Sequence, residues 1–189
     1  MTAMTTEVLG LPRGRALTRD DLDTMPDDGH RYELIDGVLI VSPAPILRHQ
    51  RAVRNLIVAV NDACPDTAEV LSAPFDVVLA QDTVIQPDIL VARNDDLTER
   101  DLPAPPLLAI EVLSPSTRGI DLLLKKERLA RAGCPHYWTV DPAEPSITAW
   151  RLSDGEFVLG TGAVGDEEFA VTDPFPVTLV PSTLITATR

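Results

Sequence analysis

Two carboxylates stand inside segments of the chain that are otherwise aliphatic. Asp88 lies within residues 85–91, which read Ile-Gln-Pro-Asp-Ile-Leu-Val, and Glu111 lies within residues 107–113, which read Leu-Leu-Ala-Ile-Glu-Val-Leu. An unpaired buried carboxylate is costly, so each acid needs a cation, a basic partner or a raised pKa. Two acids on consecutive strands favour one shared cation. Because no Cys or His cluster lies in this stretch, the oxygen ligands favour Mg²⁺, with Mn²⁺ as a substitute, over zinc.

A structural role for both acids is the alternative. Asp88 could end a strand by accepting hydrogen bonds from the backbone, and Glu111 could pair with a lysine. Pro87 bears on this choice, because proline in a strand indicates an edge, a bulge or a local break. Breaks of this kind redirect side chains near active sites.

A lysine that completes such a site must come from elsewhere in the chain, because the position two residues after Glu111 is a leucine. Lys125 and Lys126 lie on the helix expected next, which could return one ammonium to the carboxylates as it packs across the sheet. Helical periodicity leaves the choice between them open, since each has apolar residues one turn away. A pair of solvated lysines is the alternative.

The apolar pattern predicts alternating strands and helices. Asp36-Gly37 is typical of a type I′ turn and predicts a hairpin of residues 32–35 and 38–41. The helix with the two lysines begins at Ser116 or Thr117 and ends at Ala132, before Gly133. The other expected elements are helices at 19–25 and 46–63 and strands at 70–79, 84–92, 107–113, 136–140, 146–151, 157–159 and 177–180. This order predicts an α/β fold, a sheet flanked by helices with an N-terminal β-hairpin and a short C-terminal β-rich extension.

The helix expected at residues 46–63 has two different faces. Its apolar face consists of Ile46, Val53, Leu56, Ile57 and Val60. The other face carries three arginines at three-residue spacing, Arg48, Arg51 and Arg54. This spacing places the arginines on one side of a helix, where they could contact phosphate groups.

The length of 189 residues suits one compact domain with a full core. We expect residues 1–17 to form a flexible lead-in and residues 18–189 to form the single domain, with a core at 30–142 and the β-rich extension at 143–189. Two distant cysteines and the lack of an apolar leader predict a cytoplasmic protein. No apolar run approaches the roughly 20 residues of a membrane helix, so no membrane partner is expected.

The balance of charge restricts the partners of the chain. Sixteen basic and twenty-nine acidic residues leave a net charge of −13. This excludes a protein that coats nucleic acid by bulk electrostatics. Many of the acids nevertheless lie in three short segments, residues 20–28, 95–101 and 166–168, so the rest of the chain is close to neutral.

Four motifs, in their order along the chain, resemble the Uma-type putative restriction endonuclease family of the PD-(D/E)XK nuclease superfamily. They are residues 31–37 (Arg-Tyr-Glu-Leu-Ile-Asp-Gly), 86–88 (Gln-Pro-Asp), 110–117 (Ile-Glu-Val-Leu-Ser-Pro-Ser-Thr) and 132–142, which includes Ala-Gly-Cys-Pro-His-Tyr-Trp and Val-Asp-Pro. The resemblance extends from about Thr18 to Pro142, and the similarity is weaker from there to the C-terminus. It implies a restriction endonuclease-like fold, with a mixed sheet flanked by helices.

The resemblance also implies roles for individual residues. Asp88 is the metal-binding acid, Glu111 is the second acid, and the family's lysine, displaced to the next helix, corresponds to Lys125. Glu33 matches a recurrent acid of the first strand that either adds to the metal site or only supports the following turn. Supporting positions are His49, Asp121, which could orient the lysine or cap the helix, and Lys126. One departure is Leu129, where the family usually has a tyrosine.

The implied function is metal-dependent endonuclease hydrolysis of phosphodiester bonds in DNA. In it, Asp88 and Glu111 bind Mg²⁺, and Lys125 positions a water or stabilises the transition state. The alternative is a catalytically inactive nuclease-fold protein that serves as a binding or regulatory module. Because the chain is acidic, we expect weak and salt-sensitive binding to DNA. The resemblance further implies a homodimer.

Overall fold

The computed structural model describes residues 10–12 and 14–187, and predictions for other residues lie outside it. The first half of the chain forms α1 (Arg19–Leu22), β1 (Arg31–Ile35), β2 (Val38–Ser42), α2 (Leu47–Ala63), β3 (Ala68–Ser72), β4 (Asp76–Ala80), β5 (Thr83–Ile85) and β6 (Ile89–Arg93). The second half forms η1 (Asn94–Asp96), β7 (Asp101–Leu102), β8 (Leu108–Val112), the π-helical turn η2 (Ile120–Lys125), α3 (Lys126–Ala132), β9 (His136–Asp141), β10 (Ser146–Ser153), β11 (Glu156–Val164), β12 (Phe169–Val171), β13 (Val177–Leu179) and α4 (Pro181–Leu184).

Among the described residues, no helix has both the length and the apolar character of a membrane span.

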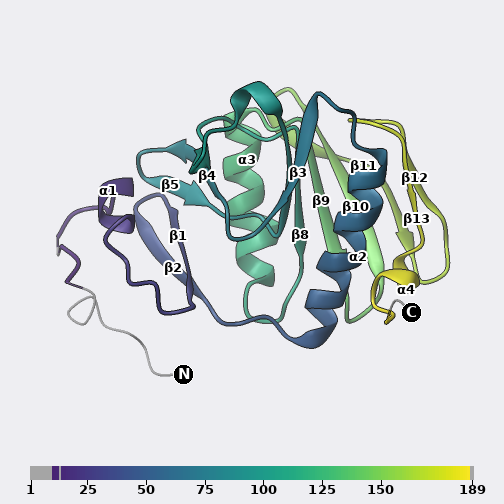
Figure 1. Ribbon diagram of the computed structural model, residues 1–189, viewed down its shortest axis with the longest axis horizontal. Helices are drawn as coiled ribbons and strands as arrows, with labels where there is room; N and C mark the ends of the chain where they lie inside the picture. The colour runs from purple at the N-terminus through teal and green to yellow at the C-terminus, as the bar shows by residue number, and fades with distance from the viewer. Residues whose placement is uncertain (1–9, 13, 188–189) are drawn as a thin grey trace.

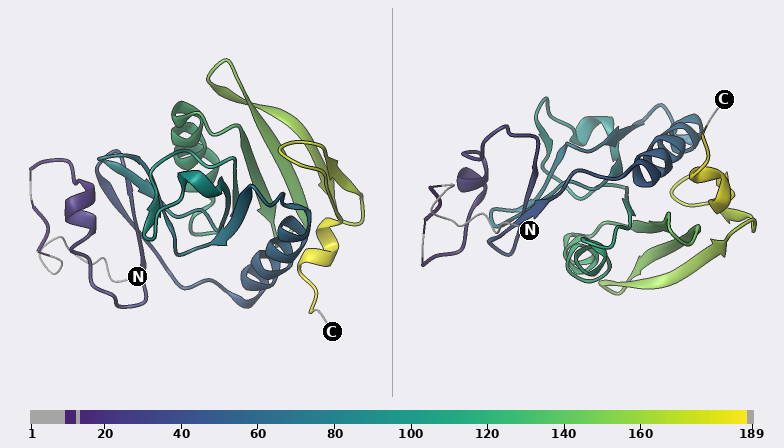
Figure 2. Two further views of the ribbon diagram at one scale, coloured as in Figure 1. Left: turned by 45° about the horizontal axis from the view of Figure 1, so that its top comes forward. Right: turned by 90° about the horizontal axis from the view of Figure 1, so that it is seen from below.

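A mixed sheet in the order β11-β10-β9-β8-β6-β3 forms the centre of the molecule (Figure 1). Strands β8 and β9 are parallel, and the other neighbours are antiparallel. Leu56 and Val60 of α2 pack on one face of this sheet, and Leu129 of α3 packs on the other (Figure 2). The prediction of an α/β fold with a mixed sheet flanked by helices is therefore confirmed. The predicted C-terminal extension adds β10 and β11 to this same sheet.

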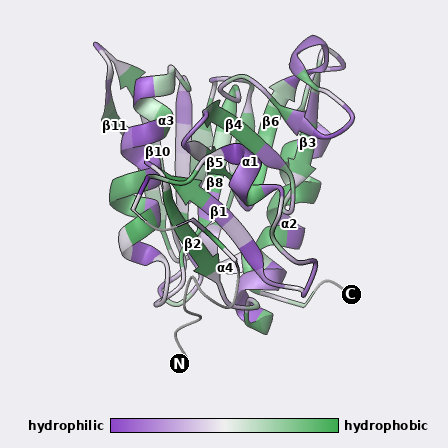
Figure 3. Ribbon diagram, turned by 90° about the vertical axis from the view of Figure 1, so that its left-hand side faces the viewer, coloured by the Kyte–Doolittle hydropathy of each residue, from purple (hydrophilic) through white to green (hydrophobic). Residues whose placement is uncertain are grey.

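A second sheet, in the order β2-β1-β5-β4-β7, contains the predicted hairpin. Asp36 and Gly37 have φ angles of 52° and 74°, which a type I′ turn requires. Strand β2 is hydrophobic along most of its length and lies at the edge of the sheet (Figure 3). The buried Leu11 and Leu17 pack against Leu34 of the hairpin, so this part of the predicted lead-in belongs to a small core.

Two prolines divide strands that the sequence analysis expected to be continuous. The stretch 70–79 forms β3 and β4, which are separated at Pro74 and lie in different sheets. The stretch 84–92 likewise forms β5 and β6, separated at Pro87. Proline has no N–H to donate to a ladder, so the chain leaves one sheet at each proline and enters the other. The prediction of two single strands was wrong, whereas the break indicated by Pro87 is confirmed.

The faces of α2 also differ in part from the prediction. Leu56 and Val60 are buried as expected, but Ile46 is 65% exposed. His49 and Ala52 take the buried positions in the first turns. The reason is that Ile46 lies before the first residue of α2 and is therefore not held against the sheet.

Replacing Gly37 with alanine is expected to destabilise the protein by at least about 1–2 kcal/mol, because the turn needs a left-handed residue. A Cβ atom at this position would also lie 2.5 Å from the Cβ atom of Ala16. Gly155→Ala is the matched control, since Gly155 has a φ of 83° and open space around its Cβ position. Urea unfolding should show the larger loss for Gly37→Ala, and equal losses would show that the contact with Ala16 is unimportant.

Candidate functional site

Glu111 lies in β8, and Asp88 directly precedes the neighbouring strand β6 of the central sheet. Ile89 of β6 lies opposite Ile110 of β8. Continuing this antiparallel register by one residue places Asp88 opposite Glu111, so that both side chains project from the same face of the sheet. The two residues are only 4% and 1% exposed. The N–H of Val112 donates a hydrogen bond of 2.9 Å to Asp88 Oδ2, which orients this carboxylate.

The break at Pro87 explains why Asp88 lies where the two sheets meet. The chain leaves β5 in the second sheet, passes through residues 86–88 and enters β6 in the central sheet. Along this crossing, the N–H of Gln86 donates a hydrogen bond of 2.7 Å to Glu33 Oε1. Glu33 is thereby brought to the same place from β1.

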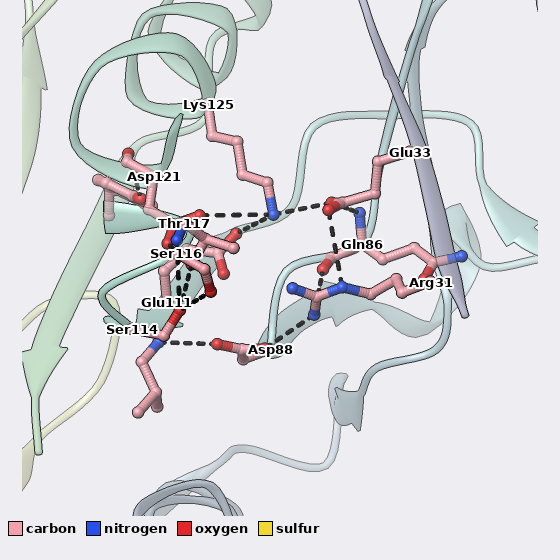
Figure 4. A network of polar contacts seen from close by, with 12 residues as sticks. Arg31, Glu33, Gln86, Asp88, Glu111, Ser114, Ser116, Thr117, Asp121 and Lys125 are labelled. Carbon is pink, nitrogen blue, oxygen red and sulfur yellow. Dashed lines mark hydrogen bonds and ion pairs between the residues drawn. The ribbon is translucent and has the colours of Figure 1, made fainter. Parts of the chain in front are cut away.

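Lys125 joins the carboxylates of the two sheets. Its Nζ lies 2.7 Å from Glu33 Oε1, 3.0 Å from Glu111 Oε1 and 3.7 Å from Asp121 Oδ1. Figure 4 shows this side chain reaching from its helix into the gap between Glu33 and Glu111. The structure therefore places Lys125 at the acids, as the resemblance implied.

Lys126 does not take part in this network. Its Nζ lies 3.0 Å from the centre of the Trp150 ring, in a cation–π contact. Adjacent residues of a helix point about 100° apart, so only one of the two lysines can face the carboxylates. The expectation that Lys126 supports the site is corrected accordingly.

Asp121 lies in the π-helical turn η2, four residues before Lys125. Its Oδ2 accepts a hydrogen bond of 2.8 Å from Thr117 Oγ1. The hydroxyl of Tyr137 donates a bond of 2.8 Å to the main-chain oxygen of Asp121, which ties the turn to β9. Turns of this type often occur at functional sites, where they alter the direction of side chains.

His49 approaches Asp88 from the first turns of α2. Its Nε2 lies 3.1 Å from Asp88 Oδ2, and the residue is buried. Its Nδ1 is buried without a hydrogen-bond partner among the described residues. His49 thus contacts the candidate metal ligand directly, consistent with a supporting position.

Arg31 is a member of the site that the sequence analysis did not single out. Its Nη1 donates a hydrogen bond of 2.8 Å to Asp88 Oδ1, and its Nε lies 3.6 Å from Glu33 Oε2. Arg31 precedes Glu33 by two residues on β1, and alternate residues of a strand share a face. The two-residue spacing between Arg31 and Glu33 was the feature of the sequence from which Arg31 could have been predicted.

A cleft of about 930 Å³ opens beside these residues. Arg31, His49 and Asp88 line it, whereas Glu33, Glu111 and Lys125 lie behind its wall. Of the three arginines expected to contact phosphate, only Arg54 lines the cleft. Arg48 and Arg51 do not line this cleft, because they lie at other positions around the turn of α2. The expectation that these two arginines contact phosphate is therefore corrected for this cleft.

The buried network carries more negative than positive charge. It contains four carboxylates and two permanent cations, namely Glu33, Asp88, Glu111 and Asp121 with Arg31 and Lys125. Burial raises the pKa of Glu111 well above its ordinary value despite the charge of Lys125. Burial likewise raises the pKa of Asp121. A further cation beside Glu111 and Asp121 would favour their ionised forms.

The pKa values of Asp88 and Lys125 shift in favour of their charged forms. Burial acts to raise the pKa of Asp88, but the hydrogen bond with His49 and the charge of Arg31 outweigh it and lower this pKa. Burial acts to lower the pKa of Lys125, but the neighbouring carboxylates, Glu111 first, outweigh it and raise this pKa. A charged Asp88 and a charged Lys125 are thus stable features of the site.

The donor set fits a divalent cation bound by two carboxylates. Glu111 Oε2 is buried and has no hydrogen-bond partner in the described part of the chain. The four carboxylates outnumber Arg31 and Lys125 by two, so one divalent ion would balance the charge of their ionised forms. Residues 10–12 and 14–187 contain no group of three or more His, Cys, Asp or Glu side chains arranged to hold one metal ion together. Asp88 and Glu111 would be the protein ligands of such an ion, since Mg²⁺ is commonly held through one or two carboxylates.

A family model described as Uma2, putative restriction endonuclease, matches residues 19–185. The chain belongs to the Uma2 family. This membership supports a nuclease function at a coarse level. No curated protein matches the Uma2-family chain.

A solved structure supports the fold of this Uma2-family chain. The crystal structure of a putative nuclease belonging to DUF820 from Anabaena variabilis ATCC 29413 is similar to it, with a TM-score of 0.69 and 20% sequence identity. The similarity covers 89% of this chain and 97% of the other chain. The two proteins therefore share a fold along nearly their whole lengths.

Proposed function

We propose that this Uma2-family chain is a metal-dependent endonuclease that hydrolyses phosphodiester bonds of DNA. The observation that carries the proposal is the buried pair Asp88 and Glu111, which the register of β6 and β8, continued by one residue, places opposite one another, with Lys125 Nζ 3.0 Å from Glu111 Oε1. Asp88 and Glu111 would hold Mg²⁺, or Mn²⁺ in its place. When bound, this ion would polarise the phosphate and lower the pKa of a water.

The other residues prepare the carboxylates for this task. Lys125 favours the ionised form of Glu111 and can orient a water beside it. His49 and the N–H of Val112 hold Asp88 Oδ2 in place. DNA would bind in the cleft, with Arg54 near a phosphate, and a homodimer would present one such site to each strand.

A titration with Mn²⁺ and a plasmid-nicking assay test this function. We expect the wild type to bind Mn²⁺ and to nick plasmid DNA, whereas Asp88→Asn should bind Mn²⁺ at least about tenfold more weakly and lose nicking. Asp27→Asn is the matched control, because Asp27 is an exposed acid that lines the same cleft. Full nicking by Asp88→Asn would contradict the proposal.

A binding or regulatory module without catalysis is the second candidate. One observation favours it: both oxygens of Asp88 already have partners, Oδ1 in Arg31 and Oδ2 in His49. For this candidate, the same experiment would show neither Mn²⁺ binding nor nicking, while a labelled DNA duplex would still bind.

A further inference from the structure

Arg31 is the cation of the buried network that reaches the cleft. Its side chain is 21% exposed and lines the cleft, whereas the side chain of Lys125 is 1% exposed and lies behind the wall. A phosphate that enters the cleft would therefore meet the guanidinium before the ammonium. Arg31 is therefore placed to meet a ligand in the cleft, whereas Lys125 is placed to act on the buried carboxylates.

The guanidinium of Arg31 has one nitrogen to spare. Its Nη1 donates to Asp88 Oδ1 at 2.8 Å and to the main-chain oxygen of Gln86 at 3.4 Å, and its Nε faces Glu33 Oε2 at 3.6 Å. Within the described residues, Nη2 donates no hydrogen bond. Two nitrogens of the guanidinium, Nη1 and Nε, thus face carboxylates. Nη2 remains as a donor for a ligand.

We propose that Arg31 is the phosphate-binding residue of this site, and the inference rests on the function proposed above. In the metal-free protein, Arg31 neutralises Asp88. With a divalent cation held by Asp88, the guanidinium of Arg31 would no longer be needed to neutralise this carboxylate and would be repelled by the ion's charge. Nη1 then becomes available together with Nη2, and the two can bind adjacent oxygens of one phosphate.

The chemistry of arginine suits this exchange. A guanidinium binds carboxylate and phosphate in the same planar, two-pronged geometry, so one side chain can pass from the first to the second. A hydrogen bond between charged groups contributes enough for its loss to weaken binding about tenfold to hundredfold. Lysine would keep the charge but not the fork.

Two titrations on the full chain separate the inference from the function on which it rests. One follows Mn²⁺ by calorimetry, and the other follows a labelled DNA duplex by fluorescence anisotropy with Ca²⁺ in place of Mg²⁺. For Arg31→Gln we expect duplex affinity to fall about tenfold to hundredfold and Mn²⁺ affinity to be equal or higher. Arg93→Gln is the matched control, since Arg93 is an exposed arginine outside the cleft lining, and it should change neither affinity appreciably.

Three outcomes would overturn the inference. Equal duplex affinities for Arg31→Gln and Arg93→Gln would show that Arg31 binds no phosphate. A parallel loss of Mn²⁺ and duplex affinity would show that Arg31 only supports Asp88. Failure of the wild type to bind Mn²⁺ would instead remove the proposed function, and the inference with it.

A measurement on the wild type keeps the inference testable if Arg31→Gln does not fold. Phenylglyoxal modifies accessible arginines, and mass spectrometry can report the extent at Arg31. We expect Ca²⁺ alone to increase the modification of Arg31 and the duplex with Ca²⁺ to suppress it. Modification that responds to neither addition would overturn the inference.

Discussion

Replacing Lys125 with methionine is expected to lower the free energy of unfolding by about 3–5 kcal/mol at neutral pH. The ammonium lies within 4 Å of Glu33, Glu111 and Asp121, and none of these residues is more than 2% exposed. Methionine fills much of the space of the lysine stem but leaves the three acids without their shared cation. Buried charges that lose their partner are strongly destabilising. Urea unfolding at constant pH measures the loss.

The adjacent Lys126 supplies a matched control for this substitution. Lys126→Met removes the same group from the next position of the helix, where it contacts Trp150, and should cost only about 0.5–1 kcal/mol. Adding Glu111→Gln to Lys125→Met should restore part of the lost stability, because one uncompensated charge is removed. A loss below about 1 kcal/mol for Lys125→Met, or no recovery in the double variant, would refute a stabilising role for this cation.

Glu111→Gln is expected to lower metal-dependent cleavage by about a hundredfold or more, because it removes one of the two carboxylates that hold the ion. The same substitution should stabilise the metal-free protein at neutral and alkaline pH. Glutamine has nearly the shape of glutamate and avoids the cost of a buried negative charge. Opposite effects on activity and stability from one substitution are characteristic of a group placed for binding.

The pH dependence of stability follows from the raised pKa of Glu111. Burial raises this pKa in the folded state above the ordinary value of 4.5, so the folded protein binds more protons than the unfolded chain. The contribution of Glu111 to stability is therefore fully present below about pH 4.5 and is lost as pH rises through the folded-state pKa. Glu111→Gln abolishes this contribution, and its advantage over the wild type should grow as pH rises.

Urea unfolding from pH 4 to 9 in the presence of EDTA tests this dependence. Glu69→Gln, an exposed acid of the same central sheet, is the control and should give a constant difference from the wild type. Added Mn²⁺ should stabilise the wild type but not Glu111→Gln. A difference between Glu111→Gln and the wild type that does not change with pH would contradict a raised pKa at Glu111.

The sequence singled out Asp88 and Glu111 as candidate acids, but it left open whether their side chains share a face of the sheet. Asp88 and Glu111 were recognisable because each interrupts an aliphatic stretch of the sequence, and the register of β6 and β8, continued by one residue, places them opposite one another. The turn at Asp36-Gly37 was predictable for a similar reason, since only a few residue types adopt left-handed conformations. Signals of this kind depend on neighbours in the chain, which the sequence shows directly.

The division into two sheets was not predictable in the same way. Pro74 and Pro87 show that a ladder is interrupted, but not that the chain enters a different sheet after the break. The second sheet brings Arg31 and Glu33 to Asp88 from more than fifty residues away. Sequence spacing carries no information about such distant contacts.

The choice between Lys125 and Lys126 shows the same limit within a single helix. Both positions have apolar neighbours one turn away, so periodicity alone could not distinguish them. The π-helical turn and the packing of Leu129 on the sheet set the rotation of the helix, which directs Lys125 to the acids and Lys126 to Trp150. The sequence by itself indicated the two candidate acids and the α/β fold, because both are visible in the local pattern of apolar residues. Only the tertiary structure decided which cations neutralise that pair and which of them reaches the cleft, because these depend on how separate elements pack.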